Sequence, residues 1–335
     1  MSIIYTIIIL CILIVTHEFG HFIVAKINGI YVEEFALGMG PKIIQWGKKE
    51  TKYSLRLFPI GGYVKMLGED DESESPRAFC NKGVLARMAV VFAGPFMNFV
   101  FAIIFFMVAF MYFGVADTNA VIGEISPDGP AAQAGLMDGD VVLSIDGNNV
   151  STWEDMVGYI QPTADQELTL EVERNGEAFS TTVIPQYNEE YKCALIGIKQ
   201  HITKANIVQS IKMGFVETYQ FTALLIKSLY QMATGQMAVD VAGPVGMVNI
   251  VGQYANEAIM YLFMLAGILS INLGIINLLP FPALDGSRLV FLAIEGIRRK
   301  PVPSEKEAMV HFVGIVILMA LMVVITVHDI SRLVG

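Results

Sequence analysis

The chain has 335 residues, of which 54% are hydrophobic and 16% are charged, and its mean hydropathy is +0.56. This composition, with apolar runs of roughly twenty residues, excludes an ordinary soluble enzyme and indicates a multi-pass membrane protein. The formal net charge of −10 argues against nucleic-acid binding, which requires a basic surface.

The first apolar segment, residues 1–30, contains the pentapeptide HEFGH. On a helix, His17 and His21 project from one face, so both imidazoles can bind one zinc ion, and Glu18 can reach a water molecule on that metal. This is the HExxH arrangement of zinc hydrolases. A chance match is the alternative. An ionisable group near the bilayer centre costs about 2.5 to 3.5 kcal/mol, however, so three such groups in one span indicate a function.

Four segments are long and apolar enough to cross about 30 Å of hydrocarbon as helices. They are residues 3–25, 88–113, 259–280 and 308–328. The first lacks a basic n-region and an A-x-A cleavage site, so we expect it to be retained as a membrane span.

The distribution of charge predicts the topology. Ten lysines and arginines lie between residues 26 and 87 and five between 288 and 306, whereas residues 117–204 contain four of them against fifteen acidic residues. The positive-inside rule therefore places the two basic loops in the cytoplasm and the acidic domain outside. With four membrane crossings, we expect both termini to be extracytoplasmic.

Residues 31–87 are predicted to form a β-hairpin region on the cytoplasmic side of the membrane, followed by an acidic connector at 68–76. The β-prone runs, separated by glycine and proline turns, are 31–37, 42–46, 53–58 and 63–67. An extended substrate could add as a strand to an exposed edge here. The alternative is a structural hairpin that only plugs the helix bundle.

The second span, 88–113, contains the sequence AGPFMN. Gly94 permits close helix approach and Pro95 frees a backbone carbonyl group. Asn98 places an amide in hydrocarbon, where it should form a hydrogen bond. Two roles stay open for Asn98, namely helix packing and an active-site hydrogen bond that positions substrate.

Residues 117–201 change to the pattern of a soluble α+β domain. Predicted strands at 121–125, 141–145, 167–174 and 179–184 surround a helix near 152–161. The run SPDGPAAQAGLMDGD resembles a PDZ domain of the bacterial type. Such domains hold an extended peptide or a free C-terminus against a strand edge, which suggests a groove beside Ile122, Gly123, Glu124 and Ile125. Steric filtering of substrates without ligand binding is the alternative.

Residues 205–257 are predicted to contain an amphipathic helix that lies on the membrane. Polar side chains share one face of this helix and apolar ones lie largely opposite, as expected at an interface. The polar set is Gln209, Lys212, Glu217, Gln220, Lys227 and Gln231. The sequence Gly243-Pro244-Val245-Gly246 then interrupts the chain before a short helix.

The third span and its extension, 259–286, end in NLLPFPALDG. A zinc hydrolase needs a third protein ligand and an open position for water. Asp285 is the candidate, because the predicted topology places it at the same membrane depth as HEFGH. It could instead cap the helix that follows. A basic loop at 287–307 leads to the last span, 308–328.

These motifs, in this order, resemble the bacterial site-2 proteases of the RseP and RasP type, which are intramembrane zinc metalloproteases. The resemblance implies zinc bound by His17, His21 and Asp285, Glu18 as general acid and base, and a substrate groove shaped by Asn277, Pro280 and Pro282. It also implies a single-span substrate that has already been trimmed, such as an anti-sigma factor or a remnant signal peptide. Some members carry two tandem PDZ domains, whereas residues 117–201 hold one.

We therefore expect a polytopic α-helical membrane protein with four spans, a membrane-associated β-hairpin and an extracytoplasmic PDZ domain. Its expected activity is zinc-dependent hydrolysis of a peptide bond within a transmembrane segment. Two other functions are considered. A PDZ scaffold without catalysis would be favoured by a broken HExxH, which is intact here. A metal transporter would be favoured by repeated halves, which are not evident.

Overall fold

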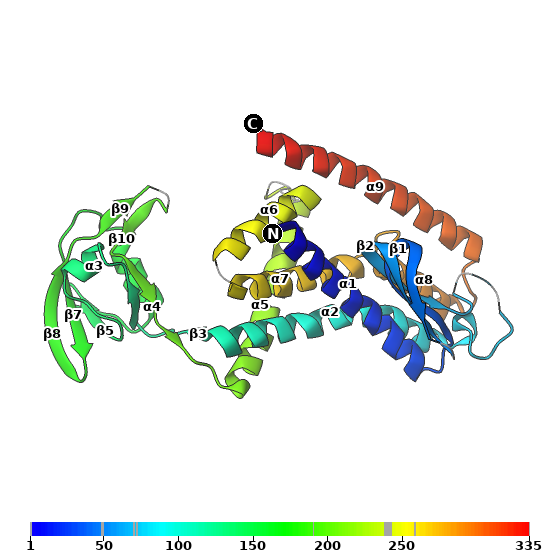
Figure 1. Ribbon diagram of the computed structural model, residues 1–335, viewed down its shortest axis with the longest axis horizontal. Coiled ribbons are helices and arrows are strands. Elements are labelled where there is room, and N and C mark those ends of the chain that lie inside the picture. Colours follow the sequence, from blue (N-terminus) through cyan, green and yellow to red (C-terminus); the bar gives the residue numbers. More distant parts are fainter. Residues whose placement is uncertain are drawn as a thin grey trace. The chain divides into compact units, whose positions relative to one another are not determined.

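The computed structural model describes residues 2–47, 50–69, 71, 73–189, 191–237, 243–257 and 259–334 (Figure 1). It divides into two compact units, one formed by Met1–Ala109 with Gln209–Gly335 and the other by Phe110–Val208. The first unit contains the membrane helices and the β-hairpin. The second is the acidic domain.

Four helices within the described residues are long and apolar enough to span a membrane. They are α1 (Ser2–Ile27), α2 (Val84–Phe113), α7 (Ile259–Leu278) and α9 (Ser304–Val334). Apolar side chains on α9 are mostly exposed, as expected of a helix surrounded by lipid. The protein is therefore a polytopic membrane protein, and α9 is longer at both ends than its apolar run predicts.

The hairpin consists of two long strands, β1 (Val32–Trp46) and β2 (Lys52–Met66), in place of four short ones. The first half of β1 pairs on both sides, since Phe35 lies opposite both Val64 and Tyr53. The strand segments are therefore ordered 62–66, 32–37, 52–56 and 42–46. Gly38 and Gly40, with φ of 85° and 84°, lie where β1 bends, a conformation that glycine adopts without strain.

The hairpin packs against the helix that carries HEFGH. A Cβ atom added to Gly62 of β2 would lie 3.0 Å from Cγ2 of Ile14 and 3.2 Å from Cγ of Glu18. A buried cluster that includes Ala25 and Val64 joins α1, the hairpin and α2. These contacts hold the edge segment 62–66 beside Glu18.

Among the described residues, this unit also contains α5 (Ile207–Ala233), α6 (Pro244–Glu257) and α8 (Asp285–Arg298), and a short 3₁₀ helix, η1, covers Phe79–Asn81. α5 buries a stripe of small residues, Ser210, Gly214 and Thr218, against α2, and its Phe221 stacks on Phe106. Its position at the membrane surface stays a prediction. Residues 238–242 lie outside the described residues. The interruption expected at Gly243-Pro244-Val245-Gly246 is shorter than predicted, because α6 already begins at Pro244.

The acidic unit has the strand and helix order expected of a PDZ domain. Its four-stranded sheet runs β6-β5-β7-β8. The element bounds are β3 (Val115–Ala116), β4 (Ile122–Ile125), α3 (Pro130–Gln133), β5 (Val141–Ile145), β6 (Asn148–Asn149), α4 (Trp153–Ile160), β7 (Leu168–Arg174), β8 (Glu177–Val183), β9 (Gln186–Asn188), β10 (Cys193–Leu195), β11 (Ile198–Gln200) and β12 (Ile202–Thr203). Thr152 and Asp155 form a capping box that begins α4. Met156 of this helix and Leu170 of β7 are both buried in the core.

Candidate metal centre

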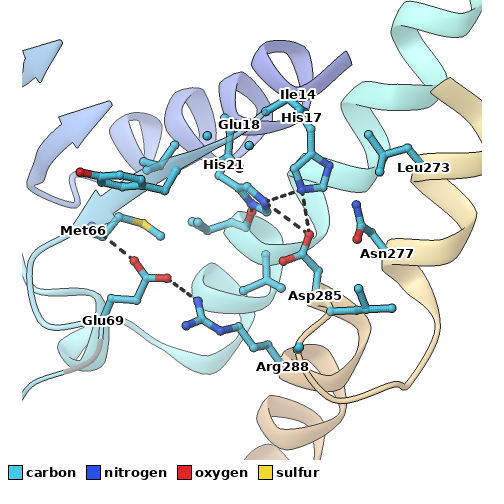
Figure 2. A pocket seen from close by; sticks show the side chains of 18 residues that line it. Ile14, His17, Glu18, His21, Met66, Glu69, Leu273, Asn277, Asp285 and Arg288 are labelled. Atoms are coloured by element: carbon cyan, nitrogen blue, oxygen red, sulfur yellow. Dashed lines mark hydrogen bonds and ion pairs between the residues drawn. The ribbon is translucent and has the colours of Figure 1, made fainter. Parts of the chain in front are cut away.

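Helix α1 presents its two histidines to the same point, because residues four apart share a face. Nε2 of His17 and Nε2 of His21 lie 3.2 Å apart, and the rings meet edge to face. Figure 2 shows both rings pointing toward Asp285, which comes from the beginning of α8. Its Oδ2 lies 3.1 Å from Nε2 of His17 and 3.4 Å from Nε2 of His21.

The donor atoms of these three residues fit a zinc ion. Zinc binds histidine nitrogen and carboxylate oxygen at about 2.0 to 2.2 Å, so neighbouring ligands of a tetrahedral site lie about 3.3 Å apart. The observed separations match that value. Nδ1 of His21 donates to the carbonyl oxygen of Val90 at 2.8 Å, which leaves the Nε2 lone pair facing the centre. Oδ2 of Asp285 is buried and accepts no hydrogen bond among the described residues.

Asp285 does not act as the N-cap of α8. The N-cap is Leu284, and this end of the helix has no side-chain cap. Asp285 occupies the first turn, and its carboxylate faces the two histidines. The geometry therefore agrees with a metal ligand better than with a helix cap.

A cavity of about 350 Å³ is lined by His17, His21 and Asp285. Glu18 lines it, one residue after His17, and Asn277 of α7 lines it as well. Gly61, Gly62, Tyr63 and Val64 of β2 form part of its wall. The cavity thus brings together a candidate base, the ligand cluster and the edge segment of the sheet (Figure 2).

The other residues suggested by the sequence lie elsewhere. Pro280 and Pro282 do not line the cavity; Pro282 instead packs against Gly314 of α9, where an added Cβ would lie 2.4 Å from it. Asn98 is fully buried, with Nδ2 3.1 Å from Nδ1 of His17, and it does not line the cavity. Asn98 therefore contacts His17 and not the cavity, and its role in positioning substrate stays a prediction.

Two charged residues that line the cavity, Glu69 and Arg288, were not predicted from the sequence. Arg288, one turn after Asp285, forms an ion pair with Glu69, and Oε2 of Glu69 also accepts from the N–H of Met66 at 3.3 Å. Figure 2 shows this pair below His17, His21 and Asp285. The only signal in the sequence was the helical spacing of Arg288 from Asp285.

The PDZ-like unit does not leave β4 open along its length. On one edge, Ile125 pairs with Ile198 of β11 and Ile122 pairs with Gln200. On the other edge, the N–H of Ile122 donates to Asp140 and its carbonyl oxygen accepts from Gly139, both at 2.8 Å. The groove expected beside Ile122–Ile125 is therefore closed at Ile122, because both edges of the strand are already paired there.

Comparison with known proteins identifies the family. Residues 5–321 match the family model of Peptidase family M50. Zinc metalloprotease RasP of Geobacillus kaustophilus is 35% identical over 413 aligned positions, which cover 99% of this chain and 98% of that protein. Regulator of sigma-W protease RasP of Bacillus subtilis is 32% identical and covers 99% of each chain. Both alignments are longer than the 335 residues here, so these relatives contain additional sequence.

Among solved structures, the PDZ domain of an SdrC-like protein from Listeria monocytogenes is 20% identical and covers 26% of this chain and 90% of that domain, with a TM-score of 0.23. The family assignment depends on the full-length relatives and on the match over residues 5–321. The name of the Geobacillus kaustophilus relative, a zinc metalloprotease, identifies zinc as the cofactor. The chain belongs to Peptidase family M50, and it is an intramembrane zinc metalloprotease of the site-2 type.

Proposed function

We propose that the protein hydrolyses a peptide bond in the transmembrane segment of a single-span substrate, at a centre held by His17, His21 and Asp285. The observation that carries this proposal is the convergence of three ligand atoms, within 4.8 Å of one another, at a cavity that Glu18 lines. When bound there, zinc would supply a Lewis acid that makes water more acidic.

Glu18 is the general base and then the general acid. Its carboxylate accepts a proton from the attacking water and returns it to the nitrogen of the leaving amine, so that the bond is broken without a net change in protons. Its place beside His17 on α1 brings it to the metal-facing wall of the cavity. Asn277, across the same cavity, is positioned to contact the substrate.

The substrate must be extended before water can reach its carbonyl carbon, because helical hydrogen bonds and side chains cover the backbone. Residues 62–66 form the edge of the hairpin sheet, and Gly62, Tyr63, Val64 and Met66 of this segment line the cavity. This placement supports strand addition by the substrate at this edge. Gly61 and Gly62 have no side chains that would obstruct the approach of another backbone.

The substrate is a membrane protein already shortened outside the membrane, such as an anti-sigma factor or a remnant signal peptide. The name of the Bacillus subtilis relative, a regulator of sigma-W, supports the first of these. The charge distribution supports an orientation with both termini outside the bacterial plasma membrane. There the PDZ-like unit filters substrates by size or binds their new C-termini.

The test compares the purified wild type with Glu18→Gln. Each is incubated with a membrane-protein fraction, and new termini are mapped by mass spectrometry. We expect termini within transmembrane segments for the wild type and a loss of at least about 10²-fold for the variant, since it lacks the base. Both proteins should contain equal zinc. Wild-type turnover by Glu18→Gln would defeat the mechanism.

A further inference from the structure

Helix α2 carries a row of residues four positions apart that faces the two histidines. Val90 accepts a hydrogen bond from His21 through its carbonyl oxygen. Gly94 follows, and a Cβ atom there would lie 2.3 Å from Nε2 of His21. Asn98 comes next and contacts Nδ1 of His17 at 3.1 Å. This spacing places all three on one face of α2.

The amide of Asn98 is buried and only partly satisfied. Its side chain is 0% exposed, and Oδ1 has no hydrogen-bond partner among the described residues. The hydroxyl group of Ser270 on α7 donates a hydrogen bond to the backbone oxygen of Asn98 at 2.7 Å. This bond does not involve the Asn98 side chain, which can therefore interact with His17. The side-chain partner here is a histidine.

The chemistry of His17 determines which end of the amide must face it. Nε2 of His17 lies 3.1 Å from Oδ2 of Asp285 and needs its lone pair to bind a metal ion. Nδ1 then carries the ring proton and needs an acceptor. A half-turn of the Asn98 amide exchanges Nδ2 for Oδ1, two ends of nearly equal shape. This turn places the unpartnered oxygen on the Nδ1 proton.

We propose that Asn98 is a positioning residue that holds His17 in the tautomer with Nε2 free for zinc, as the Val90 carbonyl group does for His21. The proposal rests on the metal centre of the proposed function. Helix α2 thus supplies an acceptor to each histidine from one face, with Gly94 leaving room for both rings between them. Asn98 acts on the metal through His17 and touches neither substrate nor metal.

The experiment measures zinc affinity of the full-length protein in detergent, by competition with a chromogenic chelator. Asn98→Leu has a similar volume but no acceptor, and we expect its affinity to fall about 10- to 100-fold, as for other partners of metal-bound histidines. Asn98→Asp keeps an acceptor and should bind zinc within a few-fold of wild type. Asn272→Leu, an asparagine of α7 that does not line the cavity, is the matched control and should match wild type.

Each outcome decides the proposal. Wild-type affinity in a folded Asn98→Leu protein overturns it. Equal losses in the Leu and Asp variants also overturn it, because a packing role would not distinguish the acceptor. If Asn98→Leu does not fold, the affinity retained or lost by Asn98→Asp decides alone. A wild type that binds no zinc would instead refute the metal centre itself, so the two failures are distinguishable.

Discussion

The backbone N–H of Ala283 donates a hydrogen bond to Nδ1 of His311, 3.1 Å away on α9. Ala283 lies two residues before Asp285 and has a φ of 76°, a left-handed conformation that costs a residue with a side chain about 1 to 3 kcal/mol. The close packing of Gly314 against Pro282 holds the same loop. Helix α9 therefore supports the conformation that delivers Asp285 to the metal centre.

Substitution of His311 should weaken that support. In His311→Leu the N–H of Ala283 loses its acceptor, which costs about 1 to 3 kcal/mol where the group is shielded from water. We expect a lower unfolding temperature in detergent and less zinc per chain. His311→Asn keeps an acceptor near the position of Nδ1 and should lose less. His328→Leu, an exposed histidine of the same helix, is the control. Unchanged zinc content in His311→Leu would show that the loop before Asp285 keeps its conformation without the hydrogen bond to His311.

Gly94 tests how closely α2 approaches the ligands. The methyl group of Gly94→Ala would overlap the ring of His21 and lie 2.9 Å from Cε1 of His17, so the rings or the helix must move. We expect zinc affinity to fall at least tenfold and proteolysis to be lost. Gly83→Ala is the matched control, because a Cβ atom at Gly83 meets nothing within 4 Å. Full zinc affinity in Gly94→Ala would mean that α2 can move away from the two histidines with little loss of stability.

The ion pair between Glu69 and Arg288 joins the end of the edge strand to the helix that carries Asp285. It should therefore set the register of a substrate strand relative to the metal. Arg288→Glu places two carboxylates together, and we expect cleavage at several neighbouring bonds with zinc content unchanged. The double variant Glu69→Arg with Arg288→Glu restores the pair and should restore one main site. Mass spectrometry of the products maps the cleavage sites of the single and the double variant. Cleavage by Arg288→Glu at the wild-type site alone would refute the prediction.

The sequence was informative wherever a signal was local. The spacing of His17 and His21 predicts one helical face, and the alternating pattern of the acidic domain predicts its strands. The membrane depth of Asp285, close to that of HEFGH, was predicted by counting the membrane crossings. The double pairing of Phe35 could not be predicted, because the register of a bent strand depends on the whole sheet. The contacts of Asn98 and His311 likewise depend on how α2 and α9 are rotated about their axes, which apolar composition does not specify.

Glu34 lies in the buried interior of the hairpin sheet. It accepts hydrogen bonds from Ser54 and Arg56 of the neighbouring segment, and Arg56 also donates to the hydroxyl group of Tyr63. The network therefore joins the edge segment 62–66 to the interior of the sheet. Burial alone would raise the pKa of Glu34, but the hydrogen bonds from Ser54 and Arg56 outweigh it and hold the pKa below its ordinary value.

This shift determines how the hairpin responds to acid. A carboxylate whose folded-state pKa is lowered contributes stability above its unfolded pKa of about 4.3, and that contribution is lost as the pH falls through the folded value. We expect the unfolding temperature of the wild type to drop more between pH 6 and pH 3 than that of Glu34→Gln, which has no charge to lose. Glu33→Gln is the control, since the Glu33 carboxylate on the same strand pairs with the exposed Lys65. Equal acid sensitivity in Glu34→Gln and the wild type would mean that this network does not stabilise the edge segment.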